Sequence, residues 1–389
     1  MKGKKLKKVL IIGAGTMQIP VIEKCKELGY ESIATDADKN APGMQIADIA
    51  LEINTLDKTA TLDAAKKYKI DGIITTSDYP VRTVAYVCEQ LGLKGLSEDA
   101  AKTCTNKYLL RENLSKHNII CPKYWKIKDL HEVTLIEKKL LYPLIVKPVD
   151  SSASRGVSKV SNYNQLETAV KEALVYSKSG DVIIEEFLEG PEYSVESLTQ
   201  NGKTIVIAIT EKTTDSSSSY FVEVRHIIPA NITSREEKEV KSLVKKVIKS
   251  IGLNNCGTHT ELKLTSKGPI IIEIGARLGG DYITSDLVPL STDVNMLENI
   301  INISIGHKIN TKITKRNYAG VQFVNSENYD SVKRHLEEIS LKSGFVRSEL
   351  KEYKKVELKS SLDRLGYYIC TAKTRKKLLD LLNYKRNNL

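Results

Sequence analysis

The sequence lacks any long apolar run, which bears on the class of protein. No segment of its 389 residues approaches the roughly 20 uncharged apolar residues that a membrane helix needs. The lysine-rich residues 1–8 lead directly into a short apolar segment, without the apolar region and small-residue cleavage site of a secretory leader. We therefore expect a cytoplasmic protein with no membrane partner.

Cysteine patterns that hold metals or redox centres are also missing. The six cysteines are scattered and form no CxxC pair. In a chain of this size, such cysteines are typical of reduced, mostly buried thiols. Neither a disulfide nor a zinc site is predicted, and no histidine has a nucleophile at the spacing of a hydrolase triad.

Positive charge is in excess, but it is dispersed. The formal net charge is +11, and the lysines fall mostly on expected helix faces such as residues 238–249 and 373–377. This distribution favours solvated helix faces over a nucleic-acid surface, which would need clustered charge. We expect no nucleic-acid partner, although part of the excess can attract a phosphorylated or carboxylate substrate.

Short apolar runs alternate with amphipathic helical stretches in the first part of the chain. In order, the segments are residues 9–12, 19–28, 32–35, 48–52, 59–67, 72–75 and 81–91. This rhythm predicts an open parallel sheet, in which ligands bind at the carboxyl ends of the strands. One such end is followed by Asp78.

The first strand end carries a glycine turn that allows two interpretations. Gly13 and Gly15 follow the strand, and Asp36 lies near the spacing of a ribose-binding acid, but the third glycine of the dinucleotide fingerprint is replaced by Gln18. The turn either forms a weak dinucleotide site or points helix amides at a substrate anion.

The pattern changes after residue 97 to β-branched runs with fewer helices, which predicts an α+β unit. Strands are expected at residues 144–147, 182–186, 193–199, 204–210, 260–264 and 270–274, with helices at 106–117, 164–175 and 235–251. After residue 312 we expect a small α/β appendage, with strands at 320–324 and 365–372, a helix at 331–339 and a basic last helix. The predicted domains are residues 1–96, 97–311 and 312–389.

Two features of the middle unit are typical of a phosphate-binding site. Lys147 ends a buried strand, where a lysine can pair with a phosphate or extend into solvent. Residues 150–157 then form a loop of small residues, which can turn amides and hydroxyls toward phosphate oxygens although it lacks the GK[ST] of a Walker loop.

Two further features involve acids. Glu185 and Glu186 end a strand, and Glu192 follows a Gly-Pro turn, so this connector either meets an adenine and ribose or is a charged surface hairpin. Glu261 and Glu273 are expected on neighbouring strands of a hairpin with its turn near residues 267–269. Because Mg²⁺ favours a couple of carboxylates plus phosphate oxygens, the pair predicts a magnesium site; an ion pair of Glu273 with arginine or lysine is the alternative.

In their order, these motifs resemble the ATP-grasp superfamily, especially L-amino-acid ligases and related carboxylate-amine ligases, and also its carbamoyl-phosphate synthase and phosphoribosylglycinamide synthetase relatives. The resemblance covers roughly residues 6–372 and includes Glu273-Ile274-Gly275-Ala276-Arg277-Leu278-Gly279-Gly280-Asp281. It implies a Rossmann-like first domain, an ATP-grasp domain whose lid is about residues 122–190, and a C-terminal α/β subdomain. Residues 211–229 are similar to the lid and substrate region of this group.

The resemblance also implies roles for individual residues. ATP would be bound by Lys107, Lys147, Ser152, Ser154, Gly156, Val157, Glu185, Glu186, Phe187, Leu188, Glu192 and Lys212. Mg²⁺ or Mn²⁺ would be bound by Glu261 and Glu273, and the acyl phosphate by Arg277, Gly279 and Gly280. The substrate contacts would be Glu223, His226, Asp281 and Ser285.

The activity implied is phosphoryl transfer from ATP to a small carboxylate, followed by attack of an amine and release of ADP and phosphate. Two alternatives stay open: a purine-pathway or carbamoyl-phosphate-type ligase, and a nucleotide-binding regulator without turnover. The chain departs from the family at Arg225, where glycine is frequent, and near Gly275, where many members carry asparagine as a third metal ligand. A homodimer is the default expectation for assembly.

Overall fold

The computed structural model describes residues 6–152, 154–214 and 222–383. Within these residues the strands form three sheets. None of the described helices combines the length and apolar content that crossing a bilayer requires. Residues 215–221, part of the predicted lid and substrate region, lie outside the described residues, as do the two ends of the predicted outer domains.

The first sheet is parallel and has the order β3-β2-β1-β4. Its strands are β1 (Lys8–Ile12), β2 (Glu31–Asp36), β3 (Ile49–Glu52) and β4 (Gly72–Ile74), and its helices are α1 (Ile19–Glu27), α2 (Lys58–Tyr68) and α3 (Val81–Leu91). The predicted open parallel sheet is therefore confirmed. Because all its strands run the same way, their carboxyl ends share one edge, and the loop after β4 begins there.

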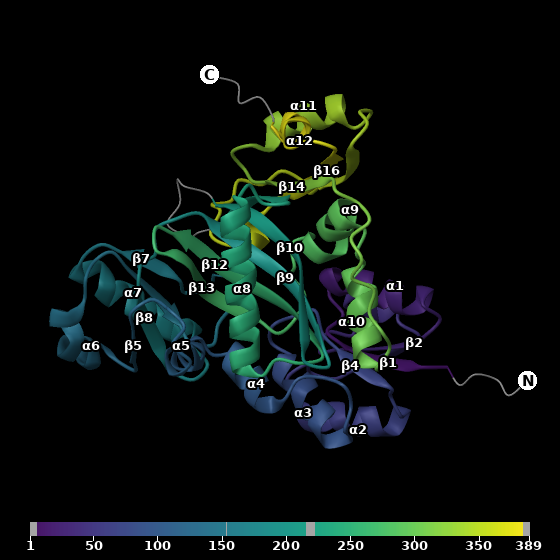
Figure 1. Cartoon of the computed structure of the whole chain (residues 1–389), viewed down its shortest axis with the longest axis horizontal. Helices are drawn as coiled ribbons and strands as arrows, with labels where there is room; N and C mark the ends of the chain where they lie inside the picture. The colour runs from purple at the N-terminus through teal and green to yellow at the C-terminus, as the bar shows by residue number, and fades with distance from the viewer. Residues whose placement is uncertain (1–5, 153, 215–221, 384–389) are drawn as a thin grey trace, which may run out of the picture.

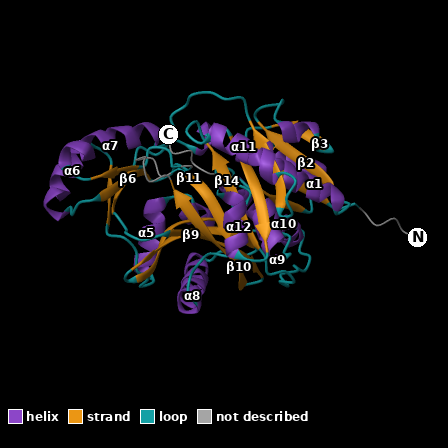
Figure 2. Cartoon of the chain, turned by 90° about the horizontal axis from the view of Figure 1, so that it is seen from above, coloured by secondary structure: helices purple, strands orange, loops and turns teal. Residues whose placement is uncertain are grey.

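The second sheet is antiparallel, with the order β5-β8-β6-β7. It contains β5 (Tyr124–Ile127), β6 (Leu144–Pro148), β7 (Ser158–Val160) and β8 (Val182–Glu186), covered by α6 (Leu130–Ile136) and α7 (Tyr163–Tyr176). Val146, Leu166 and Ile184 belong to a core of its own. This unit lies at one end of the molecule, with the first sheet at the other (Figures 1 and 2).

The third sheet has eight strands in the order β13-β12-β9-β10-β11-β14-β16-β15. They are β9 (Glu192–Gln200), β10 (Lys203–Thr214), β11 (Glu223–Ile228), β12 (Cys256–Thr265), β13 (Gly268–Gly275), β14 (Tyr318–Val324), β15 (Phe345–Leu350) and β16 (Gly366–Ala372). Every neighbouring pair is antiparallel. The C-terminal strands thus extend the central sheet, because β14 pairs with β11.

Helices α11 (Tyr329–Ile339) and α12 (Arg375–Leu382) cover these C-terminal strands (Figure 1). Val332, Tyr368 and Leu382 belong to the core that they form. The fold class, with a parallel first sheet, a two-part middle and a C-terminal α/β part, agrees with the sequence analysis, and the exact domain boundaries stay a prediction.

Short helices join the sheets. They are α4 (Glu98–Cys104), α5 (Lys107–Lys116), α9 (Val288–Thr292) and α10 (Met296–Ser304), together with the single turns Thr16–Gln18, Pro42–Gln45, Glu137–Lys139, Ile283–Leu287 and Ser361–Asp363. Helix α10 packs against both β4 and β12, so it fixes the first sheet against the central one. The sequence analysis did not identify α10.

The long helix α8 (Ser234–Ile251) packs along one face of the central sheet (Figure 1). Val240, Val244 and Val247 repeat at helical spacing and are buried. The helix begins at a capping box, in which Thr233 and Glu236 satisfy each other's backbone N–H groups.

We expect Thr233→Ala to lower the free energy of unfolding by about 1 kcal/mol, because it leaves a helix N–H without its acceptor. Denaturant unfolding measures the change, and hydrogen exchange should speed up in the first turn of α8. Ser242→Ala, on the exposed middle of the same helix, is the matched control and should cause no loss. Equal stability of the two variants would contradict the capping role.

Candidate functional site

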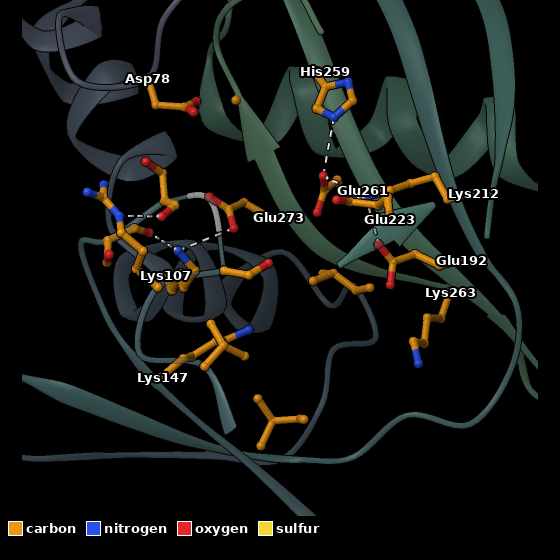
Figure 3. A pocket seen from close by; sticks show the side chains of 18 of the residues that line it. Asp78, Lys107, Lys147, Glu192, Lys212, Glu223, His259, Glu261, Lys263 and Glu273 are labelled. Carbon is orange, nitrogen blue, oxygen red and sulfur yellow. Dashed lines mark hydrogen bonds and ion pairs between the residues drawn. The ribbon is translucent and has the colours of Figure 1, made fainter. Parts of the chain in front are cut away.

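A cavity of about 300 Å³ lies between the second sheet and the edge strands of the central sheet (Figure 3). Of the predicted site residues, its wall includes Lys107, Lys147, Ser152, Ser154, Val157, Glu185, Glu186, Phe187, Leu188, Glu192, Lys212, Glu223, His226, Glu261, Glu273, Arg277, Gly280 and Asp281. Residues far apart in the sequence thus meet at one place, and the cavity is the candidate site.

Three predicted site residues are not part of this wall. Gly156 packs against Tyr176, Gly279 lies behind the wall beside Glu196, and the Ser285 hydroxyl donates to Asp286. Ser285 therefore already has a partner within the protein. Its role as a substrate contact, and the roles of the two glycines, stay predictions that the geometry does not favour.

Lysines from two elements form the first side of the cavity. Lys107 begins α5, and its Nζ donates to the Ser151 carbonyl at 2.6 Å and lies 3.2 Å from Glu273 Oε2. Lys147 lies near the end of β6, with its Nζ 2.7 Å from Glu185 Oε2. Both ammonium groups are almost fully buried, so each needs a counterion in the protein or in a ligand.

Arg111 completes this cluster, and the sequence analysis did not identify it. Its Nε donates to Glu185 Oε1 at 2.8 Å, and its Nη2 donates to the Ile272 carbonyl at 2.7 Å. Arg111 lies four residues after Lys107, on the same face of α5, and this spacing was the available signal. Among the described residues, its buried Nη1 has no hydrogen-bond partner.

The cluster has more positive than negative charge. Burial would raise the pKa of Glu185, but Arg111 and Lys147 lower it to about 2. Burial lowers the pKa of Lys147, and Arg111 and Lys107 lower it further, against the opposing effect of Glu185. A phosphate placed here would relieve the repulsion among the three cations. The carboxylate of Glu185 itself is engaged by Arg111 and Lys147, so an adenine contact from this residue would have to use its backbone.

The second side of the cavity carries carboxylates. Glu261 and Glu273 are direct cross-strand partners on β12 and β13, as the sequence predicted. Each lies beside a lysine: Glu273 beside Lys107, and Glu261 beside Lys212 at 3.0 Å. The structure therefore shows Glu273 in an ion pair with a lysine, which the sequence analysis gave as the alternative to a magnesium site.

Lys212 is held by three acids at once. Its Nζ lies 2.8 Å from Glu192, 3.0 Å from Glu223 and 3.0 Å from Glu261, although its side chain is only 3% exposed (Figure 3). Burial would lower the pKa of Lys212, and the three carboxylates raise it well above its usual value. Three acids around one cation leave net negative charge, which a divalent cation would compensate.

The donor set fits Mg²⁺ only in part. Among the described residues, no group of three or more acidic, histidine or cysteine side chains could hold a metal. Mg²⁺ in nucleotide sites takes one or two carboxylates and completes its shell with water and phosphate oxygens. Glu261 and Glu273 therefore match a metal that arrives with a nucleotide.

A buried histidine network lies behind Glu261 and was not predicted. His259 Nδ1 is hydrogen bonded to Glu196, its direct partner on β9, and its Nε2 lies 3.3 Å from Glu261 Oε1. The second oxygen of Glu196 accepts from the Gly279 N–H at 3.2 Å. A Cβ at position 279 would lie 2.7 Å from His259 Nδ1, so only glycine fits there. The network connects a predicted metal ligand to the predicted acyl-phosphate loop.

At the predicted substrate end of the cavity, a residue from the C-terminal part of the chain contacts two residues of the wall. Arg364 donates to Asp281 Oδ2 at 2.7 Å and to Glu223 Oε2 at 3.1 Å. His226 Nε2 lies 3.7 Å from Asp281 Oδ2. Arg364 was not predicted as a site residue, because its approach depends on β16 joining the central sheet. Arg225, the first departure from the family, donates instead to Gln322 on β14 at 2.7 Å.

The glycine turn after β1 is not part of the cavity wall. The Ala14 N–H donates to Asp36 Oδ2 at 2.9 Å, and the Asp38 N–H donates to Asp36 Oδ1 at 3.0 Å. Both oxygens of Asp36 therefore shape the turn. This use of Asp36 argues against the dinucleotide interpretation.

Residues 140–286 match the family described as ATP-grasp domain. The matched segment includes Lys147, Glu185, Glu261, Glu273 and Arg277, so most of the cavity wall lies in the part of the chain that is similar to this family.

Curated relatives and solved structures are also similar to this chain. The alanine–anticapsin ligase of Bacillus subtilis (strain 168) is 30% identical over 240 residues, which are 56% of this chain and 50% of that protein. A formate-dependent phosphoribosylglycinamide formyltransferase of Prochlorococcus marinus (strain MIT 9515) is 31% identical over 186 residues, 47% of this chain and 48% of that protein. The crystal structure of an L-amino acid ligase from Bacillus licheniformis has a TM-score of 0.80 at 22% identity and covers 98% of this chain and 100% of that chain. The chain spans about half the length of these two curated relatives, and the solved structure supports the fold.

The protonation of His259 gives a test of the buried network. Burial would lower the pKa of His259, but the Glu196 charge and the hydrogen bonds to Glu196 and Glu261 raise it to about 9, from 6.5. The folded pKa is the higher one, so the stabilisation is complete below about pH 6.5 and is lost as the pH rises through about 9. We expect His259→Gln to lose on the order of 3 kcal/mol more at pH 6 than at pH 10.

Urea unfolding of the variant and of the natural chain at both pH values measures this difference. His131→Gln, on the exposed surface of α6, is the control and should show no such pH dependence. A loss that is equal at both pH values would contradict an imidazolium at position 259.

Proposed function

We propose that this protein is an ATP- and Mg²⁺-dependent ligase that activates a carboxylate as an acyl phosphate and joins it to an amine. The observation that carries the proposal is the meeting of Lys107, Lys147 and Arg111 with Glu261 and Glu273 in one cavity. The cations suit the phosphates of ATP, and the facing acids suit the metal that accompanies them. The likeness to the alanine–anticapsin ligase and to the L-amino acid ligase structure supports the same activity.

The residues of the cavity wall have different roles, which follow from their positions. Lys107, Lys147 and Arg111 bind the phosphates, while Phe187 and Leu188 lie on the wall where the adenine would be placed. Bound Mg²⁺, held by Glu261 and Glu273, would neutralise charge on the transferred phosphoryl group. Arg277 would donate to the acyl phosphate oxygens, and no covalent bond to the protein is required. Catalysis then comes from positioning and charge stabilisation.

The substrate end favours an amine over a phosphorylated compound. Glu223 and Asp281 lie at the wall there and share the cation Arg364, and Glu223 also pairs with Lys212, which Glu192 and Glu261 approach as well. Burial would raise the pKa of Asp281, but Arg364 and His226 lower it below its usual range, so the acid stays charged. Four acids around two cations attract an ammonium and repel a phosphate. This distribution favours the amine of the proposed reaction, and the purine-pathway or carbamoyl-phosphate-type alternative stays compatible with the comparisons.

The regulator alternative has less support. A protein that only senses a nucleotide needs cations for the phosphates, but it does not need a fixed arginine and an acidic substrate end beside them. Assembly as a homodimer and a cytoplasmic location stay predictions.

A phosphate-release screen tests the proposal directly. The protein is incubated with MgATP and pooled amino acids, with other small acids and amines in further pools, and products are identified by mass spectrometry. We expect release that requires both an acid and an amine. No release with any pool, together with intact binding of MgADP, would favour the regulator.

We expect Glu273→Gln to lower kcat by on the order of 10² or more, because it removes a metal-binding charge while keeping the side-chain volume. Phosphate release measures kcat, and the melting temperature should change little. Glu52→Gln, on the exposed edge strand β3, is the control and should behave like the natural chain. Preserved activity in Glu273→Gln would exclude the metal role.

We expect Arg277→Lys to lower kcat by on the order of 10² or more while the affinity for ATP stays within a few-fold. A lysine cannot offer two parallel N–H groups to the acyl phosphate oxygens. Steady-state kinetics at varied ATP separates the two effects. Equal losses in ATP binding and turnover would place Arg277 at the nucleotide instead.

A further inference from the structure

Arg277 is joined to a residue of the first sheet. Asp78 lies in the loop after β4, 199 residues before Arg277 in the sequence. Both side chains line the cavity, with 31% and 17% of their surfaces exposed. In Figure 3, Asp78 is seen at the upper left, away from Lys147 and Lys263.

The contact fixes both the position and the plane of the guanidinium. Nε donates to Asp78 Oδ1 at 2.7 Å, Nη2 donates to Oδ2 at 2.8 Å, and Nη1 donates to the Leu278 carbonyl at 2.9 Å. A guanidinium has five N–H groups, so one remains on each Nη. The two remaining N–H groups have a fixed direction, because a bidentate pair allows little rotation.

Gly275 provides the room for this pair. A Cβ at position 275 would lie 3.3 Å from Asp78 Oδ1 and 3.5 Å from Arg277 Nε. Gly275 is not among the glycines with positive φ, so its backbone conformation does not require glycine. A side chain at position 275 would therefore require the ion pair to shift by a few tenths of an ångström.

Electrostatics keeps the pair charged. Burial would raise the pKa of Asp78, but the charge and hydrogen bonds of Arg277 lower it, with smaller contributions from His259 and Lys107. Burial would lower the pKa of Arg277, and Asp78 raises it. Both groups therefore remain ionised around neutral pH.

We propose that Asp78 is a positioning residue, which holds the Arg277 guanidinium at the angle that the acyl phosphate requires, and that Gly275 is needed for this contact. The first sheet thereby takes part in the reaction although the ATP site lies between the other two sheets. The inference rests on the proposed function, since it assigns Asp78 a role through Arg277.

The test uses the full chain and the acid–amine pair found active in the phosphate-release screen. We expect Asp78→Asn to lower kcat about tenfold, because the amide keeps the shape but cannot accept at both positions, and a small misplacement of a catalytic group costs this much. The KM for ATP and the calorimetric affinity for MgADP should stay within about threefold, because Asp78 has no contact with the lysines that bind phosphate. The double variant Asp78→Asn, Arg277→Lys should be no slower than Arg277→Lys alone, within about threefold, because both act through one group.

The matched control is Glu98→Gln. Glu98 pairs with Lys58 at 2.8 Å, and the two side chains are 36% and 38% exposed, so this ion pair also joins two different elements but lies outside the cavity. Its loss should leave kcat unchanged. Gly275→Ala provides a second variant that keeps both charges and crowds the pair; we expect it to lower kcat at least threefold and to leave MgADP binding unchanged.

The outcomes separate this inference from the proposed function. If the natural chain binds no MgADP, or releases no phosphate with any acid and amine, the proposed function fails and this inference fails with it. If the natural chain is active and Asp78→Asn keeps its kcat, only the positioning role of Asp78 is overturned. An equal loss in Glu98→Gln, or independent losses that multiply in the double variant, would also overturn it. If Asp78→Asn does not fold, unchanged kcat in Gly275→Ala would overturn it.

Discussion

Buried ammonium and guanidinium groups need counterions, and this requirement organises the site. Lys107, Lys147, Lys212 and Arg111 are all withdrawn from water, where an unpaired charge would cost several kcal/mol or more. Each forms an ion pair with a glutamate that lies on a different secondary-structure element. The second sheet, α5 and the central sheet are thus linked by charge as well as by packing.

The same requirement makes the cavity responsive to ligands. Two ion pairs of the cavity wall, Lys107 with Glu273 and Lys212 with Glu261, join a group suited to phosphate with a group suited to a metal. A nucleotide with its metal offers both kinds of partner at once, so the internal pairs can be exchanged without leaving a buried charge alone. The binding of either component without the other would leave part of the network uncompensated.

Local pattern predicted many of the elements, and the order of the motifs indicated most of the residues that line the cavity. The parallel first sheet follows from alternating apolar and helical segments, and the facing of Glu261 and Glu273 follows from a hairpin of known register. The residues that were missed have their partners far away in the sequence. Glu196 meets His259 through the pairing of β9 with β12, and Asp78 meets Arg277 across two sheets. The apolar periodicity of one segment does not show which distant segment it will contact.

The C-terminal part illustrates the same point on a larger scale. Its strands show the expected alternation, but whether they form a separate sheet or extend the central one depends on the exposed edge of β11. An unpaired strand edge is a ready template, and β14 occupies it. This pairing brings Arg364 to Glu223 and Asp281, which explains why sequence reasoning found the two acids and not the arginine.

The contact of Arg364 with two residues of the cavity wall has a consequence for synthesis on the ribosome. Glu223 and Asp281 emerge before Arg364, the cation that bridges them. Until then the two acids lack this counterion, and β14 has not yet covered the edge of β11. A growing chain can therefore complete its first sheet during translation well before these two acids acquire the contacts that Arg364 makes with them.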